Sequence, residues 1–176
     1  ISPTLIRAPL QRLVAERLLE MQNNRSVIVP VLSAPAFEEL THIRIAVEGL
    51  AGEMAATRMS ESGLVEIQAT LAGMQRAIEA GDARGYLALN EAFHFAIYQH
   101  AGAPILLNMI RDLWGRVGPY LKLLMQADRY IPQSNDAHRG IVAALEQRDG
   151  PAVRVSLEQD IAVAAAVLSE NLRTTT

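Results

Sequence analysis

The fold is decided by a stretch near the start of the chain, residues 33–59, which reads SAPAFEELTHIRIAVEGLAGEMAATRM. Ser33 can cap the N-terminus of a helix, and Pro35 suits the first helical turn. Apolar side chains follow at helical spacing and form one stripe, made of Phe37, Leu40, Ile43, Val47, Leu50 and Met54. The pattern predicts an amphipathic helix over about 35–59 that buries one face against other elements.

The chain after this helix repeats the pattern, since capping and helix-ending residues interrupt it at intervals, among them Ser60, Gly81 and Asp82. Five further helices are predicted over about 60–81, 82–102, 104–126, 134–149 and 151–172. A kink is predicted at Gly118-Pro119, in the helix over 104–126. Strand signals are almost absent after residue 32. We therefore predict an all-α fold, an antiparallel bundle of about six helices.

The first 32 residues have a different pattern. Apolar residues at helical spacing from Leu10 to Met21 predict a helix, and Asn23-Asn24-Arg25 separates two short β-favouring stretches. Pro30 in the second stretch suits an edge strand or a strand end. We predict a helix and a small hairpin in a first domain over 1–32, followed by the helical domain over 33–176.

Composition limits the classes of protein that this chain can belong to. Its 176 residues suit one domain plus a fragment. No apolar run approaches the roughly 20 residues that cross a bilayer, and no leader opens the chain, which predicts a cytoplasmic protein without membrane contact. The net charge of −3 gives no general attraction to nucleic acid, but residues 1–25 hold four arginines against two glutamates. Any nucleic-acid contact is expected there.

Four polar residues form the candidate site. Asn90 and His94 stand four positions apart in the predicted third helix and project from the same face. His138 lies near the start of the fifth helix and Asp160 lies in the sixth, so all four can converge in an antiparallel bundle. Asp160 has apolar neighbours, and a buried carboxylate needs a partner such as a divalent cation. The alternative is that the histidines are ordinary surface or core residues and that Asp160 faces solvent.

Several stretches of the helical part resemble the FCD effector domain of GntR-family transcription regulators, in their FadR-like branch. Asn90-Glu91-Ala92-Phe93-His94 is similar to the Asp-x-x-Phe-His signature of that domain. Residues 138–145, HRGIVAAL, resemble its passage from the fifth to the sixth helix, and Arg44 with Glu48 resembles its opening Arg-x-x-x-Glu helix. The resemblance covers residues 33–172.

The N-terminal part resembles the second half of the GntR winged helix. Residues 2–13 are similar to its recognition helix and residues 18–27 to its wing. The resemblance implies DNA contacts for Ser2, Thr4, Arg7, Asn24 and Arg25. Because only this half of the module is present and Pro9 disfavours a helix, we expect no specific DNA binding by the segment alone.

The resemblance also implies a metal centre. The family usually offers Asp, His, His and His, where this chain offers Asn90, His94, His138 and Asp160. The negative charge therefore moves from the first position to the last. With no cysteine in the chain, these residues would hold a divalent metal such as zinc or nickel through imidazole and carboxylate ligands.

The function implied is that of a metabolite-responsive transcription regulator. A small organic acid would bind in the bundle and shift how a homodimer presents its winged helices to operator DNA. Arg44 and Arg116 are candidates to bind the carboxylate of that effector, because a guanidinium offers two parallel donors. The alternative for each is a salt bridge, with Glu48 and Asp112 respectively.

Two other classes stay open from the residues alone. A metal-dependent enzyme acting on a small carboxylate could use the same ligands, but no acid or base partner is evident beside them. A helical dimerisation module without a ligand is the other. We predict a regulator rather than an enzyme.

Overall fold

The computed structural model describes residues 3–15, 18–23, 26–126 and 130–174. Its elements are α1 (Pro3–Ala15), β1 (Glu20–Gln22), β2 (Ser26–Ile28), α2 (Ala34–Arg58), α3 (Glu61–Glu79), α4 (Ala83–His100), α5 (Pro104–Leu121), the 3-10 helix η1 (Lys122–Gln126), α6 (Tyr130–Glu146) and α7 (Gly150–Thr174). The predicted all-α bundle with a small hairpin ahead of it is therefore confirmed.

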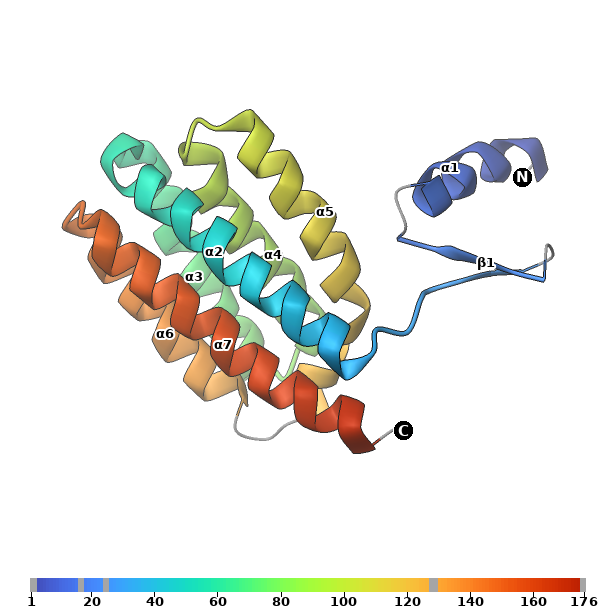
Figure 1. Cartoon of the computed structure of the whole chain (residues 1–176). Helices are drawn as coiled ribbons and strands as arrows, with labels where there is room; N and C mark the ends of the chain where they lie inside the picture. The colour runs from blue at the N-terminus through green and yellow to red at the C-terminus, as the bar shows by residue number, and fades with distance from the viewer. Residues whose placement is uncertain (1–2, 16–17, 24–25, 127–129, 175–176) are drawn as a thin grey trace.

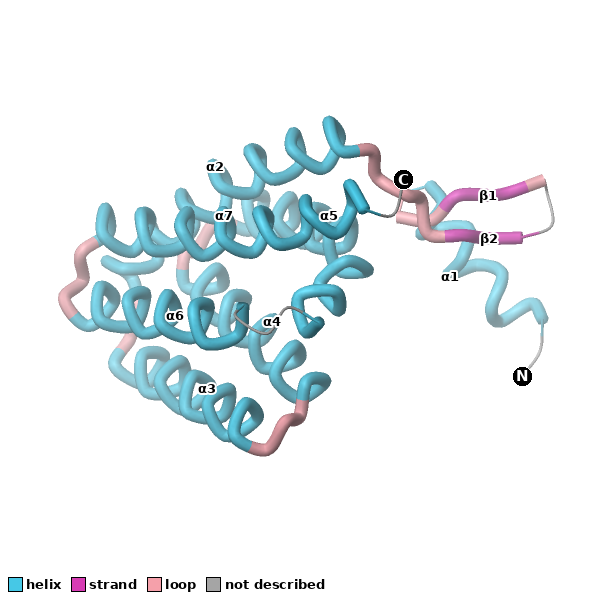
Figure 2. Tube along the Cα trace, turned by 90° about the horizontal axis from the view of Figure 1, so that it is seen from below, coloured by secondary structure: helices cyan, strands magenta, loops and turns pink. Residues whose placement is uncertain are grey.

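The helices of the bundle lie roughly side by side, with α1 and the hairpin set apart at one end (Figure 1). Helix α2 packs along α7, α7 along α6, and α3 against both α4 and α6. Helix α5 covers α2 and α4 (Figures 1 and 2). Strands β1 and β2 pair antiparallel, with Met21 opposite Val27. No helix in the described ranges is long and apolar enough to cross a bilayer.

The caps predicted from the sequence form and set the starts of three helices. The Ser33 hydroxyl accepts a hydrogen bond from the backbone N–H of Ala36 at 3.3 Å. Ser60 and Asp82 do the same at the starts of α3 and α4, at 3.0 and 2.9 Å. Gly81 adopts φ +65°, a left-handed conformation that suits glycine at the turn between α3 and α4. Local sequence thus determines where these helices begin.

Several predicted boundaries are wrong. The helix expected from Leu10 to Met21 instead spans Pro3–Ala15, and Met21 lies in β1. Leu18 and Leu19 both donate backbone hydrogen bonds to the Leu13 carbonyl, which closes the helix with a turn. The apolar spacing continues past this turn because Leu18 packs over Gly115 of α5 rather than along the same helix.

Two later boundaries also differ. The helix predicted over 104–126 is α-helical only to Leu121 and continues as η1. Helix α6 begins at Tyr130 and not near Ser134. Pro132 is compatible with this earlier start because it falls in the first turn, where backbone N–H groups have no acceptor within the helix and a proline therefore removes no helical hydrogen bond.

The close contact between α2 and α7 depends on glycine. A Cβ added to Gly52 would lie 2.1 Å from Cδ1 of Leu157 and 3.0 Å from Cγ1 of Val153, both fully buried on α7. The absence of a side chain lets the two helices approach each other. This contact sets the distance between the second half of α2 and the beginning of α7.

We expect Gly52→Ala to lower the free energy of unfolding by about 1–3 kcal/mol, because Leu157 must move into a packed core. Urea denaturation measures the change. Gly140→Ala is the matched control, since its Cβ would meet only the Ser156 hydroxyl at 3.7 Å and alanine favours a helix. Equal stability of the two variants would contradict the close-packing account.

Candidate metal centre

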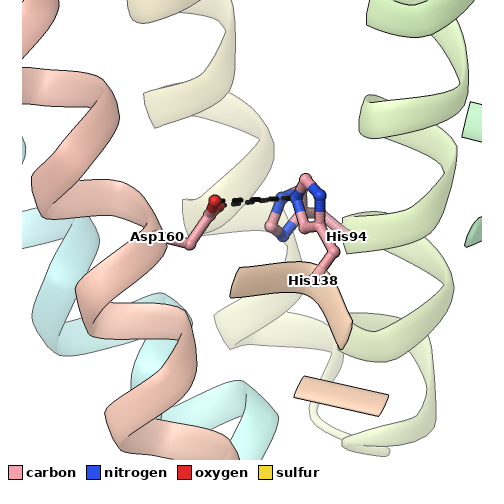
Figure 3. A group of neighbouring side chains, drawn as sticks. All are labelled: His94, His138 and Asp160. Carbon is pink, nitrogen blue, oxygen red and sulfur yellow. Dashed lines mark hydrogen bonds and ion pairs between the residues drawn. The ribbon is translucent and has the colours of Figure 1, made fainter. Parts of the chain in front are cut away.

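Three side chains from three helices meet inside the bundle: His94 of α4, His138 of α6 and Asp160 of α7 (Figure 3). The Nε2 atoms of the two histidines lie 3.3 Å apart. Asp160 places Oδ2 3.3 Å from Nε2 of His94 and Oδ1 3.6 Å from Nε2 of His138. All three residues are buried. The structure thus brings together residues that are 66 positions apart along the chain, the separation from His94 to Asp160.

The apolar faces of the helices carry these side chains into the core. His94 follows Phe93 on the buried face of α4, and the His138 ring contacts the Phe93 ring edge to face at 4.9 Å between centroids. Asp160 lies on the buried face of α7 beside Leu157. Burial of a carboxylate among such neighbours is costly unless a cation or hydrogen-bond donors compensate it.

The three ligand atoms fit a divalent cation in spacing and in chemistry. A tetrahedral zinc ion with bonds of about 2.0–2.1 Å holds its ligand atoms roughly 3.3 Å apart. The two histidine Nε2 atoms lie 3.3 Å apart, and Nε2 of His94 lies 3.3 Å from Oδ2 of Asp160, both close to that value. The 3.6 Å distance from Nε2 of His138 is measured to the other carboxylate oxygen, Oδ1. Two imidazole nitrogens with one carboxylate oxygen form a donor set that zinc and nickel accept.

The charge states of the ligands suit a cation as well. Burial lowers the pKa of His138 from 6.5 to about 4, against the opposing attraction of the Asp160 carboxylate. Burial alone would raise the pKa of Asp160, but the two histidines and the Ser134 hydroxyl outweigh it and lower this pKa from 3.8 to about 2. At neutral pH the site therefore offers a neutral His138 imidazole and an ionised carboxylate.

A short hydrogen-bond chain orients the carboxylate. The Ser134 hydroxyl donates to Oδ1 of Asp160 at 3.2 Å, and the Tyr86 hydroxyl donates to Ser134 at 3.3 Å. Burial raises the pKa of Tyr86 to about 12, so the phenol keeps its proton and remains a donor. Sequence reasoning missed both Ser134 and Tyr86 as residues of the site.

A second chain starts at His94. Its Nδ1 lies 3.2 Å from the Tyr98 hydroxyl, which is 2.7 Å from Oε2 of Glu48. Glu48 is fully buried and also accepts a hydrogen bond from the Trp114 indole at 2.8 Å. The spacing of four residues between His94 and Tyr98 is a signal in the sequence that these two side chains can meet. No comparable signal in the sequence indicates the contacts of Glu48 with α4 and α5.

Asn90, the fourth predicted ligand, is buried one helical turn before His94. Among the described residues no hydrogen bond joins its amide to His94, His138 or Asp160. Its role as a metal ligand stays a prediction.

The two arginines predicted to bind an effector lie on α2 and α5. Arg44 donates from Nε to Oε1 of Glu48 at 2.7 Å, and its guanidinium lies 5.2 Å from the centre of the Trp114 ring. The salt bridge considered as the alternative for Arg44 is therefore present. Burial alone would lower the pKa of Arg44, but Glu48 outweighs it and raises that pKa. Arg116 is half-buried on α5, two residues after Trp114.

An open cleft of about 810 Å³ lies next to the candidate metal centre, between α4 and α5. Trp114 and Phe95 line it together with Arg111 and Lys122. None of the three ligand side chains reaches the cleft wall. Trp114 therefore separates the cleft from the buried centre while contacting the His94 ring at 5.6 Å between centroids.

The predicted DNA-binding residues are the least described. Ser2, Asn24 and Arg25 lie outside the described residues, and Thr4 and Arg7 lie in α1, where only the helix is described. Their roles stay predictions.

The segment before the bundle is tied to α5 by Tyr120. The Tyr120 hydroxyl donates to the Pro30 carbonyl at 3.1 Å and accepts from the backbone N–H of Leu32 at 2.8 Å. Leu18 of the same N-terminal segment packs over Gly115, which lies five residues before Tyr120 on α5. Helix α5 thus contacts both the centre, through Trp114, and the N-terminal segment.

Comparison of the sequence with known proteins matches one family model and two transcription regulators. The family model described as the FCD domain matches residues 39–163. The chain is 31% identical over 169 residues to the HTH-type transcriptional regulator McbR of Escherichia coli, a match that covers 93% of this chain and 76% of McbR. It is 29% identical over 164 residues to the probable D-xylose utilization operon transcriptional repressor of Paenarthrobacter nicotinovorans, covering 92% and 70%.

Solved structures agree with these sequence matches. The structure of Escherichia coli McbR superposes with a TM-score of 0.88 at 29% identity, covering 94% of this chain and 83% of that one. A GntR transcriptional regulator from a Rhodococcus species superposes with a TM-score of 0.77 at 23% identity, covering 96% and 80%, and shares the fold.

Proposed function

This chain belongs to the GntR family of transcription regulators that carry an FCD domain, and from that premise we propose that it responds to a small organic acid bound beside a divalent metal ion. The relatives that cover most of the chain are transcription regulators, and a metal-dependent enzyme is not supported. In this proposal, residues 33–176 form the effector domain and residues 1–32 form part of a winged helix that contacts operator DNA.

The convergence of His94, His138 and Asp160 carries the proposal. Two imidazole nitrogens and one carboxylate, with nitrogen-to-nitrogen and nitrogen-to-oxygen distances of 3.3–3.6 Å, provide three of the positions that a zinc or nickel ion requires. When bound, such an ion supplies a positive centre that attracts carboxylate oxygens. Asn90, one turn from His94, can approach the same ion or its ligand.

A carboxylate effector would also need charged donors. Arg44 and Arg116 are the two candidates, and a guanidinium can donate two parallel hydrogen bonds to a carboxylate. Arg44 already uses Nε on Glu48, which is 0% exposed. Arg44 can therefore bind the acid in two ways: with other guanidinium hydrogens while it keeps its contact with Glu48, or by exchanging that contact for the acid.

In this proposal, helix α5 couples the candidate metal centre to the DNA-binding segment. Trp114 on α5 is hydrogen-bonded to Glu48 beside the centre, and Tyr120 on the same helix holds the backbone of Pro30 and Leu32. A shift of α5 on effector binding would move the segment that precedes the bundle. The effector must bind one arrangement more tightly than the other for this shift to occur.

A homodimer is part of the proposal. Exposed apolar side chains lie on the contacting helices α2 and α5, namely Ile43, Leu50, Ile105 and Met109. Ile43 and Leu50 are seven residues apart and so lie on the same side of α2. A second copy of the chain that covers this surface would remove the apolar area from water.

We expect Leu50→Asp to convert the dimer into a monomer, because a carboxylate in the centre of an apolar contact loses its hydration without gaining a partner. Light scattering during size-exclusion chromatography should then give the mass of one chain, 19.2 kDa, rather than twice that value. Val65→Asp on α3, at a side chain that is 62% exposed, is the matched control and should leave the dimer intact. A Leu50→Asp variant that keeps the dimer mass would refute the assigned surface.

Metal analysis of the purified protein, together with its native mass spectrum, tests the proposed function. We expect a stoichiometric divalent transition metal and, in some preparations, a bound small acid. A protein that takes up no metal from excess zinc or nickel would refute the metal part of the proposal.

A further inference from the structure

We propose that Glu48 and Tyr98 are positioning residues that hold the proton of His94 on Nδ1, so that Nε2 keeps its lone pair toward His138 and Asp160. The inference rests on the proposed metal-binding function and deepens it. It assigns a role to the buried glutamate of α2, which neither binds the ion nor contacts solvent.

The Glu48 carboxylate accepts hydrogen bonds from three residues, Arg44, Tyr98 and Trp114. Arg44 donates to Oε1 at 2.7 Å, and the Trp114 indole donates to Oε2 at 2.8 Å. Guanidinium and indole nitrogens can only donate, so the carboxylate is the acceptor in both bonds. Arg44 and Glu48 form a buried ion pair, in which the carboxylate acts only as an acceptor.

The ion pair with Arg44 fixes the direction of the hydrogen bond between Glu48 and Tyr98. The Tyr98 hydroxyl lies 2.7 Å from Oε2 of Glu48 and must donate its only proton to it. A phenol keeps its proton at neutral pH, so the Tyr98 hydroxyl remains the donor in this bond. The Tyr98 oxygen can then act only as an acceptor toward His94.

The tautomer of His94 follows from that constraint. Nδ1 of His94 lies 3.2 Å from the Tyr98 oxygen, and a hydrogen bond between them requires the hydrogen to be on Nδ1. In the neutral ring Nε2 then carries a lone pair, the form that binds a metal ion. Nε2 faces Nε2 of His138 and Oδ2 of Asp160, each at 3.3 Å.

The arrangement distinguishes the two histidines. Nδ1 of His138 is buried and has no hydrogen-bond partner in the described part of the chain, so no comparable chain fixes its proton. His94 is thus the ligand with a preset orientation. Without a metal ion, Nε2 of His94 can carry a second proton toward Oδ2 of Asp160 at 3.3 Å, while Nδ1 keeps its own; a bound cation takes the place of that second proton.

Tyr98→Phe and Glu48→Gln test the inference through metal affinity. Loss of such an outer partner is expected to weaken zinc binding about 10- to 100-fold, measured by competition with a chelating dye. Tyr120→Phe is the matched control, because it removes a buried hydroxyl of the same bundle away from the centre and should keep the wild-type affinity. Circular dichroism confirms that each variant is folded.

The second readout is the proton position itself. Long-range ¹H–¹⁵N NMR of the metal-free protein distinguishes the two tautomers, and we expect His94 to carry its hydrogen on Nδ1 in the wild type. Tyr98→Phe, which removes the acceptor, should produce a mixture or the opposite tautomer. A shift in the tautomer without any zinc binding by the wild type would support the positioning role and refute the metal proposal instead.

Two results would overturn the inference. One is a wild-type His94 with a hydrogen on Nε2 and none on Nδ1. The other is a folded Tyr98→Phe variant with an unchanged tautomer and unchanged zinc affinity. Because Glu48→Gln leaves Arg44 without its ionised partner and can unfold the bundle, the decision rests on Tyr98→Phe.

Discussion

Replacing His138 with alanine is expected to reduce bound zinc or nickel from about one ion per chain to background. His138 supplies one of three converging ligand atoms and is fully buried, so the variant leaves a cavity where the imidazole was. Loss of a direct ligand should cost more than the roughly 10- to 100-fold loss caused by changing an outer partner. Metal analysis after dialysis against a weak chelator measures the effect.

Asn90→Ala is the matched comparison on the same helix as His94. A neutral amide oxygen is a poor ligand for zinc or nickel, and the described structure joins Asn90 to none of the three ligands by a hydrogen bond. We expect little change in metal content. Equal and negligible metal in the wild type and both variants would refute the metal centre.

The second large effect concerns the effector. At least one small mono-, di- or hydroxycarboxylate should raise the melting temperature of the metal-loaded wild type, because a ligand that binds only the folded state stabilises it. The shift should fall in His94→Ala, which damages the ion site, and in Arg44→Ala. A charge-assisted hydrogen bond contributes roughly 1.5–3 kcal/mol, so loss of one should weaken binding by about one to two orders of magnitude.

Arg44 needs a further comparison because it is bonded to Glu48. If its role is only that ion pair, Arg44→Ala will lower the stability of the ligand-free protein more than it lowers affinity for the acid. Arg116→Ala provides the second test of carboxylate binding. The carboxylate-sensor proposal is wrong if no acid stabilises the metal-loaded wild type while a neutral or cationic metabolite does.

The bundle could be predicted from the sequence because its signals are local. Ser33, Ser60 and Asp82 cap helices within three residues of their partners, and apolar stripes repeat every turn. The N-terminal helix was misplaced because Leu18 continues the apolar spacing although it packs on α5. Periodicity predicts an apolar face but not which element covers it, and Ile43 and Leu50 of the predicted apolar stripe are exposed in the single chain.

The same limit applies to the candidate centre. The shared face of Asn90 and His94 follows from helical spacing, and the buried position of Asp160 follows from its apolar neighbours. The hydrogen bonds of Glu48 join residues 50 and 66 positions away, at Tyr98 and Trp114. Such contacts depend on how α2, α4 and α5 pack, which no local pattern in one sequence specifies.

An anomalous difference map at the zinc absorption edge, from crystals of the zinc-loaded protein, tests the central claim most directly. The account predicts one peak per chain within bonding distance of Nε2 of His94, Nε2 of His138 and the Asp160 carboxylate. A zinc-loaded protein whose peaks all lie elsewhere, with none among these three side chains, would contradict it.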